Sequence, residues 1–307
     1  MTGEVKPKST GFVWFVWLVT CLIWSTVWLA IKIGVTAVPP LTFAYSRLVI
    51  ALAVLVPAAA LRGRLRVTRA DAGILLATGF LLLGVNYALV FWGARFVPSG
   101  LVAVLQSATP LCGLALAAGL GLERASGGKI AGLLLGMAGV ALISARQTST
   151  PGTSGAAWGC AAIMGGAVCV AIAYVLVKLK RPSADPTTVI CWQMMAGVVP
   201  LAVAGIAVEG NPLTMPFTSR VVAAMVYLAL AGSVAAFWLN YWLLQRLEAS
   251  AVLLIAVAEA PLAAMWGALA LGERLDGPTI AGSILVLAGS AVVIRLTSRA
   301  TPRRTSS

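Results

Sequence analysis

The sequence predicts an all-α integral membrane protein. We expect ten transmembrane helices, arranged as two five-helix inverted repeats within a single membrane domain (residues 1–307), with both termini cytoplasmic. Three observations lead to this prediction. Hydrophobic residues make up 60% of the chain, one long stretch of sequence occurs twice, and the positive charges gather on one side of the expected spans.

The composition is that of a protein buried in lipid. Only 10% of the residues are charged, whereas soluble domains carry about 25%, and the mean hydropathy is +0.98. Apolar runs of about 20 residues suit a hydrocarbon core about 30 Å thick. The expected spans are residues 12–33, 41–61, 71–94, 99–120, 127–145, 155–177, 187–208, 221–245, 250–271 and 277–296. The connections between them are too short to hold another domain.

The placement of Lys and Arg predicts the orientation. If the N-terminus is cytoplasmic, 16 of the 22 Lys and Arg residues lie on the cytoplasmic side, five lie on the other side, and Arg47 lies within a span. Cytoplasmic loops of membrane proteins carry such an excess. The net charge of +13 therefore follows the topology and does not form a basic domain for nucleic acid. We expect a multi-pass protein of the inner (plasma) membrane.

One stretch of the chain occurs twice, in two similar copies. RFVPSGLVAVLQSATP at 95–110 corresponds to RLEASAVLLIAVAEAP at 246–261, at an offset of 151 residues. After a further apolar run, the Glu-Arg pair that begins at Glu123 corresponds to the pair at Glu273, at an offset of 150. Each copy is two spans joined by a charged turn, which indicates an internal duplication.

The two halves are expected at residues 12–146 and 155–296. Each half contains five spans, an odd number, so the second copy enters the membrane in the opposite orientation to the first. Inverted repeats with a binding site near the bilayer midplane are a recurrent plan of secondary transporters.

These motifs resemble those of a known family. The runs are IWSTVWLAIKIG at 23–34 and PLTFAYSRL at 40–48, with the paired PLCGLALAAGLGLE at 110–123 and PLAAMWGALALGE at 261–273. They resemble the ten-helix, EamA-type members of the drug/metabolite transporter superfamily, in which the YddG-like amino-acid exporters are one group. The resemblance implies a basket of helices 1, 3, 4, 6, 8 and 9 around a central cavity. It also implies export of small metabolites or amino acids from the cytoplasm.

Glu259 is the strongest candidate for a functional residue. It lies near the middle of the ninth span, where a charge costs several kcal/mol unless it is paired, protonated or hydrated. It could bind a substrate ammonium group or cycle a proton. Alternatively it is a structural carboxylate, neutral or paired, for example with Arg47. For Arg47 a structural, snorkelling role is expected, and for Lys32 the role of an interfacial anchor.

A set of polar and aromatic side chains within the spans could line the substrate site. The candidates for substrate binding are Trp24, Trp28, Asn86, Tyr87, Gln106, Thr109, Tyr174, Trp238, Tyr241 and Glu259. Aromatic rings stack on apolar substrates and attract cations. Aromatic residues also gather at membrane interfaces without binding ligands. Gln106 and Thr109 share a helix face, and a polar contact between helices is the alternative for them.

Two prolines and a set of glycines are expected to affect the shape and the packing of the helices. Pro110 and Pro261 are expected to interrupt helices 4 and 9, as gating kinks or as packing bends. Small residues in helices 5 and 10 permit close helix approach; these are Gly132, Gly136, Gly139, Gly282 and Gly289. They favour either packing within the chain or a weak homodimer through these helices, so a monomer and a weak homodimer both remain open.

The sequence therefore predicts a secondary transporter that exports small organic solutes, such as amino acids, aromatic ones among them, or related metabolites and drugs. An exchanger of sugar phosphates or nucleotide sugars is the alternative within transport. A membrane-embedded enzyme or a structural protein is the alternative of a different class. An enzyme is disfavoured because the chain has no histidine and no HExxH or GxSxG pattern. We expect no cofactor and no metal site; the partners are a small-molecule substrate and the lipid bilayer.

Overall fold

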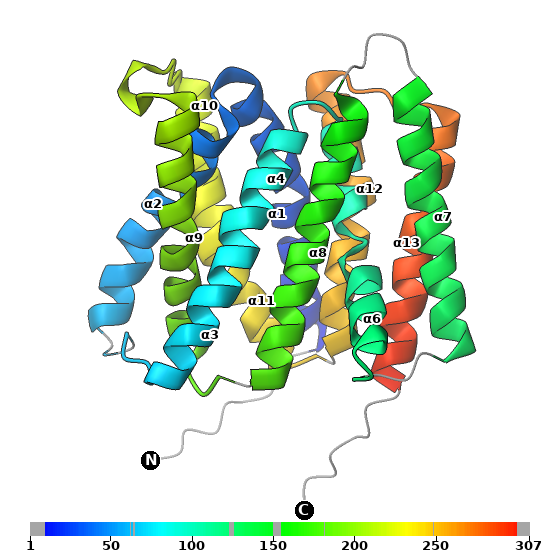
Figure 1. Cartoon of the computed structure of the whole chain (residues 1–307), viewed down its shortest axis with the longest axis horizontal. Helices are drawn as coiled ribbons and strands as arrows, with labels where there is room; N and C mark the ends of the chain where they lie inside the picture. The colour runs from blue at the N-terminus through cyan, green and yellow to red at the C-terminus, as the bar shows by residue number, and fades with distance from the viewer. Residues whose placement is uncertain are drawn as a thin grey trace, which may run out of the picture.

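The computed structural model describes residues 10–299 apart from positions 62, 64, 123–125, 150–154, 181 and 248. Its helices stand side by side in one bundle, with the start of α1 and the end of α13 at the same end (Figure 1). Glu123 and Arg124, which open the charged turn of the first repeat, lie outside the described residues.

Ten spans account for the described secondary structure. The elements are α1 (Thr10–Ala37), α2 (Pro40–Leu61), α3 (Arg69–Gly79), η1 (Phe80–Val85), α4 (Asn86–Gly93), α5 (Ser99–Gln106), α6 (Thr109–Gly119), α7 (Gly127–Ser149), α8 (Ala156–Lys180), α9 (Pro186–Glu209), η2 (Pro212–Thr214), α10 (Ser219–Ala229), η3 (Leu230–Ala235), α11 (Ala236–Leu244), α12 (Ala249–Leu271) and α13 (Gly277–Arg299). Within the described residues, nine helical segments are long and apolar enough to cross a membrane, and Gly127–Ile143 of α7 is a shorter apolar helix. The expected all-α membrane bundle is confirmed.

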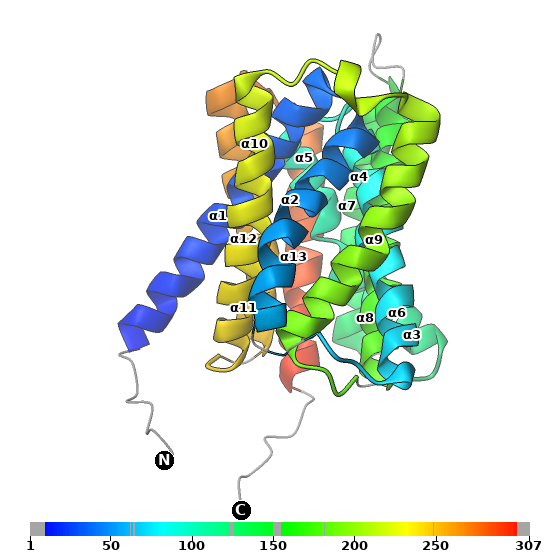
Figure 2. The same cartoon turned by 90° about the vertical axis from the view of Figure 1, so that its left-hand side faces the viewer.

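The two halves of the chain run in opposite directions. α1 and α8, the first spans of the two halves, cross the bundle in opposite senses (Figure 1). α1 packs against α10 and α12 of the second half, and α8 packs against α4 and α6 of the first. Figure 2 shows α1 tilted as it passes α10 and α12. The prediction of inverted repeats is thus confirmed, while the repeat boundaries and the cytoplasmic termini stay predictions.

The third and eighth spans contain a feature that hydropathy did not predict. Each contains one π-helical stretch, Phe80–Val85 in the third span and Leu230–Ala235 in the eighth, 150 residues apart. Both are flanked by ordinary α-helix. π-Helical turns are rare and occur frequently at functional sites. Their repeat-related positions show that the bulge belongs to the duplicated design of the fold.

Helix starts are set by capping side chains in the loops. The hydroxyls of Thr68 and Thr218, again 150 residues apart, accept hydrogen bonds from the first turns of α3 and α10. The Glu209 carboxylate accepts from the backbone nitrogens of Leu41 (2.9 Å) and Thr42 (2.7 Å) at the start of α2. Such caps satisfy backbone donors that a helix leaves free at its N-terminus.

The glycines of the fifth and tenth spans pack against each other. A β-carbon on Gly139 would lie 2.5 Å from the carbonyl oxygen of Gly282, and one on Gly289 would lie 2.5 Å from that of Gly132. The backbones of α7 and α13 therefore touch at two repeat-related points. The glycine pattern reflects packing within the chain, so it gives no support to a homodimer through these faces.

The orientation can be tested by single-cysteine labelling. We expect Val67→Cys, between α2 and α3, to react with an impermeant thiol reagent only from the cytoplasmic side. Leu213→Cys, in the 90% exposed position of the opposite loop, should react only from outside. The unsubstituted chain gives the baseline, because Cys21, Cys160 and Cys191 are buried and Cys112 and Cys169 are partly buried. Reversed labelling of the two positions would overturn the assignment of both termini to the cytoplasm.

Candidate substrate site

Glu259 occupies a buried position between the first and ninth spans. Its side chain is 7% exposed, and its Oε1 accepts a hydrogen bond of 3.3 Å from the indole nitrogen of Trp28. Oε2 is buried and finds no hydrogen-bond partner in the described part of the chain. Because a buried polar atom without a partner is rare and costly, this oxygen is a candidate acceptor for a proton or a substrate cation.

Arg47 does not pair with Glu259. The Arg47 side chain is 2% exposed, so it does not snorkel. Its Nη2 donates to the hydroxyl of Ser233 (2.8 Å) and to the carbonyl oxygen of Leu228 (3.4 Å), and its guanidinium lies 5.1 Å from the centroid of the Tyr87 ring. Nε is left without a partner among the described residues. The guanidinium is thus held by a hydroxyl, a carbonyl and a ring.

The Arg47 contacts lie at the π-helical turn of the eighth span. Leu228 precedes η3 and Ser233 lies within it, and the Ser233 hydroxyl itself donates to the Leu228 carbonyl (3.0 Å). In the first half, Gln193 of α9 donates to the hydroxyl of Thr78 (3.0 Å), just before η1. The second span of each half therefore forms hydrogen bonds with the span of the other half that contains the π-helical turn. Gln193 follows Arg47 by 146 residues, the offset of a weaker sequence similarity between the starts of the two halves, so the two residues correspond in the repeat.

Two amides meet beside the third span. Asn86 donates from Nδ2 to the carbonyl of Leu82 (3.0 Å), within η1, while its Oδ1 is buried without a partner in the described residues. Gln106 donates to the carbonyl of Ile163 on α8 (3.0 Å). A β-carbon on Gly166 of α8 would lie 2.5 Å from Asn86 Oδ1 and 3.2 Å from Gln106 Nε2. Asn86 and Gln106 therefore lie against the same glycine of α8, and Gln106 makes the polar contact between helices that was its alternative role. Their part in substrate binding stays a prediction.

The Thr109 hydroxyl binds a backbone carbonyl at the break in the fourth span. Residues 107–108 separate α5 from α6, and Pro110 lies in the first turn of α6. Proline has no N–H, so the carbonyl of Gln106 loses its helical donor. The Thr109 hydroxyl donates to that carbonyl instead (2.7 Å). The hydroxyl of Ser290 on α13 binds the carbonyl of Ser107 (2.8 Å). The predicted interruption at Pro110 is confirmed.

Pro261 behaves differently from Pro110. It lies inside α12, which continues through it from Ala249 to Leu271. The ninth span is therefore not broken into two helices at Pro261, and the role of Pro261 as a gating kink or a packing bend stays a prediction. A single proline removes one donor and bends a helix, but neighbouring hydrogen bonds can carry the helix past it.

The aromatic candidates divide into a partly buried group and an exposed group. Trp28 binds Glu259, Trp24 lies edge-on to Phe237 with ring centroids 6.2 Å apart, and Tyr87 stacks on Phe91 at 5.4 Å. In contrast, the side chains of two further candidates on α8 and α11 are more than half exposed; these are Tyr174 (57%) and Trp238 (64%). Their part in substrate binding stays a prediction. The side chain of Tyr241 lies outside the described part of the structure.

Two charged residues that the sequence did not connect hold the turn between α4 and α5. Lys32 donates to the carbonyl oxygens of Ala94 (2.8 Å) and Val97 (2.7 Å). Glu273 accepts from the backbone nitrogen (2.9 Å) and the hydroxyl (2.8 Å) of Ser99. A cation at a helix C-terminus and an anion at a helix N-terminus each complement the helix dipole. Lys32 therefore caps a helix end, a role that an interfacial anchor would not require.

Comparison with known proteins identifies relatives along almost the whole chain. "Uncharacterized transporter YoaV" of Bacillus subtilis is 27% identical, covering 87% of this chain and 91% of its own length. "Probable amino-acid metabolite efflux pump" of Salmonella typhimurium is 25% identical, covering 90% and 92%. "Probable terminal-alkyne amino-acid exporter" of Streptantibioticus cattleyicolor is 26% identical, covering 94% and 95%.

The fold and the repeat are also found in known proteins. One solved structure, titled "Crystal structure of protein", superposes with a TM-score of 0.63 at 22% identity, covering 95% of this chain and 100% of its own, and so has the same fold. The sequence profile of the EamA-like transporter family matches twice, at residues 10–145 and 157–295. Two matches, one in each half of an inverted helical bundle, confirm the resemblance drawn from the motifs. The chain therefore belongs to the EamA-like transporter family and is a multi-pass membrane transporter.

Proposed function

We propose that this transporter exports small solutes of the amino-acid type from the cytoplasm by alternating access, with Glu259 binding the substrate ammonium group or cycling a proton. The observation that carries this proposal is the buried Glu259 carboxylate, with one oxygen held by Trp28 and the other without a partner in the described chain. Trp28 and Glu259 come from opposite repeats, so relative motion of the halves would change the surroundings of the carboxylate.

A second buried acceptor supports a substrate with a cationic end. This is Asn86 Oδ1, which has no partner among the described residues. Two of the similar proteins are named for amino-acid efflux or export. An exchanger of phosphorylated sugars would need buried cations for phosphate. Arg47, the cation nearest to that requirement, is already held by Ser233, the Leu228 carbonyl and Tyr87.

Flux in proteoliposomes tests this proposal. Vesicles that contain the purified chain are loaded with a radiolabelled neutral amino acid, and its exit is followed with and without an imposed proton gradient. We expect exit to be accelerated relative to protein-free vesicles and to be inhibited by other amino acids. Methyl esters, which keep the ammonium group, should compete better than N-acetyl derivatives, which lack it. Absence of flux for all amino acids, with folded protein present, would overturn the proposal.

Direction is tested separately in cells. Cells that produce the chain should accumulate less of a labelled amino acid supplied as a dipeptide than cells without it, because export removes the amino acid after hydrolysis. Greater accumulation in the producing cells would indicate import and would contradict the exporter assignment.

A further inference from the structure

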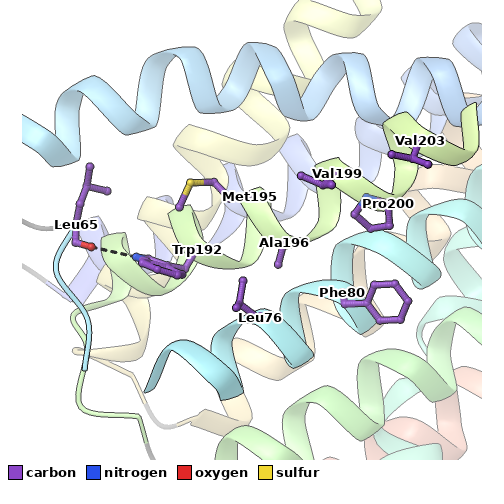
Figure 3. Close-up of a pocket in the computed structure, with 9 residues that line it drawn as sticks. All are labelled: Leu65, Leu76, Phe80, Trp192, Met195, Ala196, Val199, Pro200 and Val203. Atoms are coloured by element: carbon purple, nitrogen blue, oxygen red, sulfur yellow. Dashed lines mark hydrogen bonds between the residues drawn. The ribbon is translucent and has the colours of Figure 1, made fainter. Parts of the chain in front are cut away.

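The outer face of the bundle carries a large apolar hollow between the third and seventh spans. Its volume is about 900 Å³, and Figure 3 shows the side chains that surround it. The lining residues are Leu65, Leu76, Phe80, Trp192, Met195, Ala196, Val199, Pro200 and Val203. All are apolar or aromatic, and none is among the residues described above as contacting Glu259 or Arg47.

The hollow is a consequence of helix packing. The backbones of α3 and α9 touch on its inner side, where a β-carbon on Gly79 would lie 2.5 Å from the backbone of Gln193. Large side chains then stand out on either side of this contact. Phe80 of η1 (47% exposed) and Val199 of α9 (62% exposed) form part of the two walls. The result is an open apolar groove that faces away from the protein interior.

The length of the groove matches one leaflet of a bilayer. The lining residues of α9 extend from Trp192 to Val203, eleven residues apart, which corresponds to about 16 Å along a helix. The hydrocarbon core is about 30 Å thick. The groove therefore extends from one membrane surface to about the midplane, the depth reached by one acyl chain of that leaflet.

The surface end of the groove is positively charged. Leu65 lies at this end, where its carbonyl accepts a hydrogen bond from the indole nitrogen of Trp192 (3.0 Å), and Trp is typical of the membrane interface. Arg66 follows it directly and Arg69 begins α3, and both are exposed. In the described chain neither forms an ion pair. The nearby Asp71 is engaged with the backbone and hydroxyl of Ser183.

We propose that this groove binds one anionic phospholipid, with its phosphate at Arg66 and Arg69 and an acyl chain along α9. The apolar walls fit a hydrocarbon chain, and the two guanidinium groups complement a phosphate that carries a negative charge. A neutral, zwitterionic headgroup would gain less from the same arginines. In the predicted topology the lipid belongs to the cytoplasmic leaflet. This site is separate from the substrate site and does not rest on the proposed function.

Native mass spectrometry of the full chain, purified in mild detergent and mixed with phosphatidylglycerol or phosphatidylcholine, tests the proposal. We expect the chain to retain phosphatidylglycerol in preference to phosphatidylcholine. The double variant Arg66→Gln/Arg69→Gln should weaken phosphatidylglycerol retention at least about tenfold. Val199→Trp, which fills the groove from its exposed side, should weaken it as well.

Matched controls separate this site from general effects. Arg220→Gln removes an exposed arginine from the start of α10, at the opposite membrane surface. Leu134→Trp places the same ring at a 61% exposed position on α7. Both controls should retain lipid like the unsubstituted chain. Equal retention of the two lipids, or undiminished retention in either groove variant, would overturn the proposal. Loss of solute flux in Val199→Trp with lipid retention intact would assign the groove to the substrate and would also overturn it.

Discussion

Replacing Glu259 with Gln is expected to lower solute flux at least about tenfold, which corresponds to about 1.4 kcal/mol of binding or activation free energy. Gln has nearly the same shape, and its carbonyl oxygen can still accept from Trp28, so the fold should be retained. It cannot carry a negative charge or take up a proton. The loss should therefore appear in flux, or as a flattened pH response, with an unchanged amount of folded protein in the membrane.

Two further variants show whether the effect is specific to Glu259. Trp28→Phe keeps an aromatic ring but removes the hydrogen-bond donor to Oε1, and we expect a smaller loss of flux. Glu209→Gln neutralises a carboxylate that caps α2 at the surface, and flux per folded molecule should stay close to that of the unsubstituted chain. Undiminished flux of Glu259→Gln at every pH would show that this carboxylate has a purely structural role.

The second large effect concerns stability. Gly139→Ala should lower the midpoint of thermal unfolding, because the new β-carbon would lie 2.5 Å from Gly282 O and 2.8 Å from Val286 N. Both atoms belong to the backbone of α13 and cannot rotate away. Overpacking of this kind costs about 1–3 kcal/mol, which exceeds the gain of about 0.5–1 kcal/mol that alanine brings to a helix interior.

Gly113→Ala is the matched control for this prediction. Gly113 lies in α6, and a β-carbon there would meet no atom within 4 Å. The same substitution should therefore leave the unfolding midpoint unchanged or raise it. The two variants can be compared in one detergent by heating followed by size-exclusion chromatography of the remaining folded protein. Equal midpoints would show that α7 and α13 do not pack as tightly as their glycines indicate.

Several features of the fold could be predicted because their causes are local in sequence. An apolar run long enough to span a membrane must form a helix there, because the bilayer offers no partner to a free backbone group. The ten spans follow from this requirement, whereas the break at Pro110 follows from the missing N–H of proline. The inversion follows from counting spans between two similar stretches. Asn86, Tyr87, Trp28 and Glu259 could be selected as candidates because polar and aromatic side chains within a span are conspicuous; their role in substrate binding stays a prediction.

Other features could not be predicted, because they depend on how helix faces meet. Nothing in FLLLGV or LAGSVA identifies a π-helical turn, and both turns are seen only in the backbone of the folded chain. In the eighth span, Arg47 and Ser233 bind the Leu228 carbonyl at this turn. Tyr174 and Trp238 looked equivalent to Trp28 in the sequence, but their side chains are more than half exposed, whereas Trp28 is partly buried against Glu259. Pro261 could not be distinguished from Pro110, because continuation of a helix depends on the hydrogen bonds around the proline.

By itself, then, the sequence determined the membrane class, the number of spans and the inverted duplication, since each depends on hydropathy and on the order of residues along one segment. The tertiary structure decided which side chains became partners: Trp28 with Glu259, 231 residues apart, Arg47 with the eighth span, and Glu273 with Ser99, 174 residues apart. Periodicity fixes which residues share a face of one helix. The rotation and tilt of each helix against its neighbours are set by close packing of all of them together, and this decides where each face points.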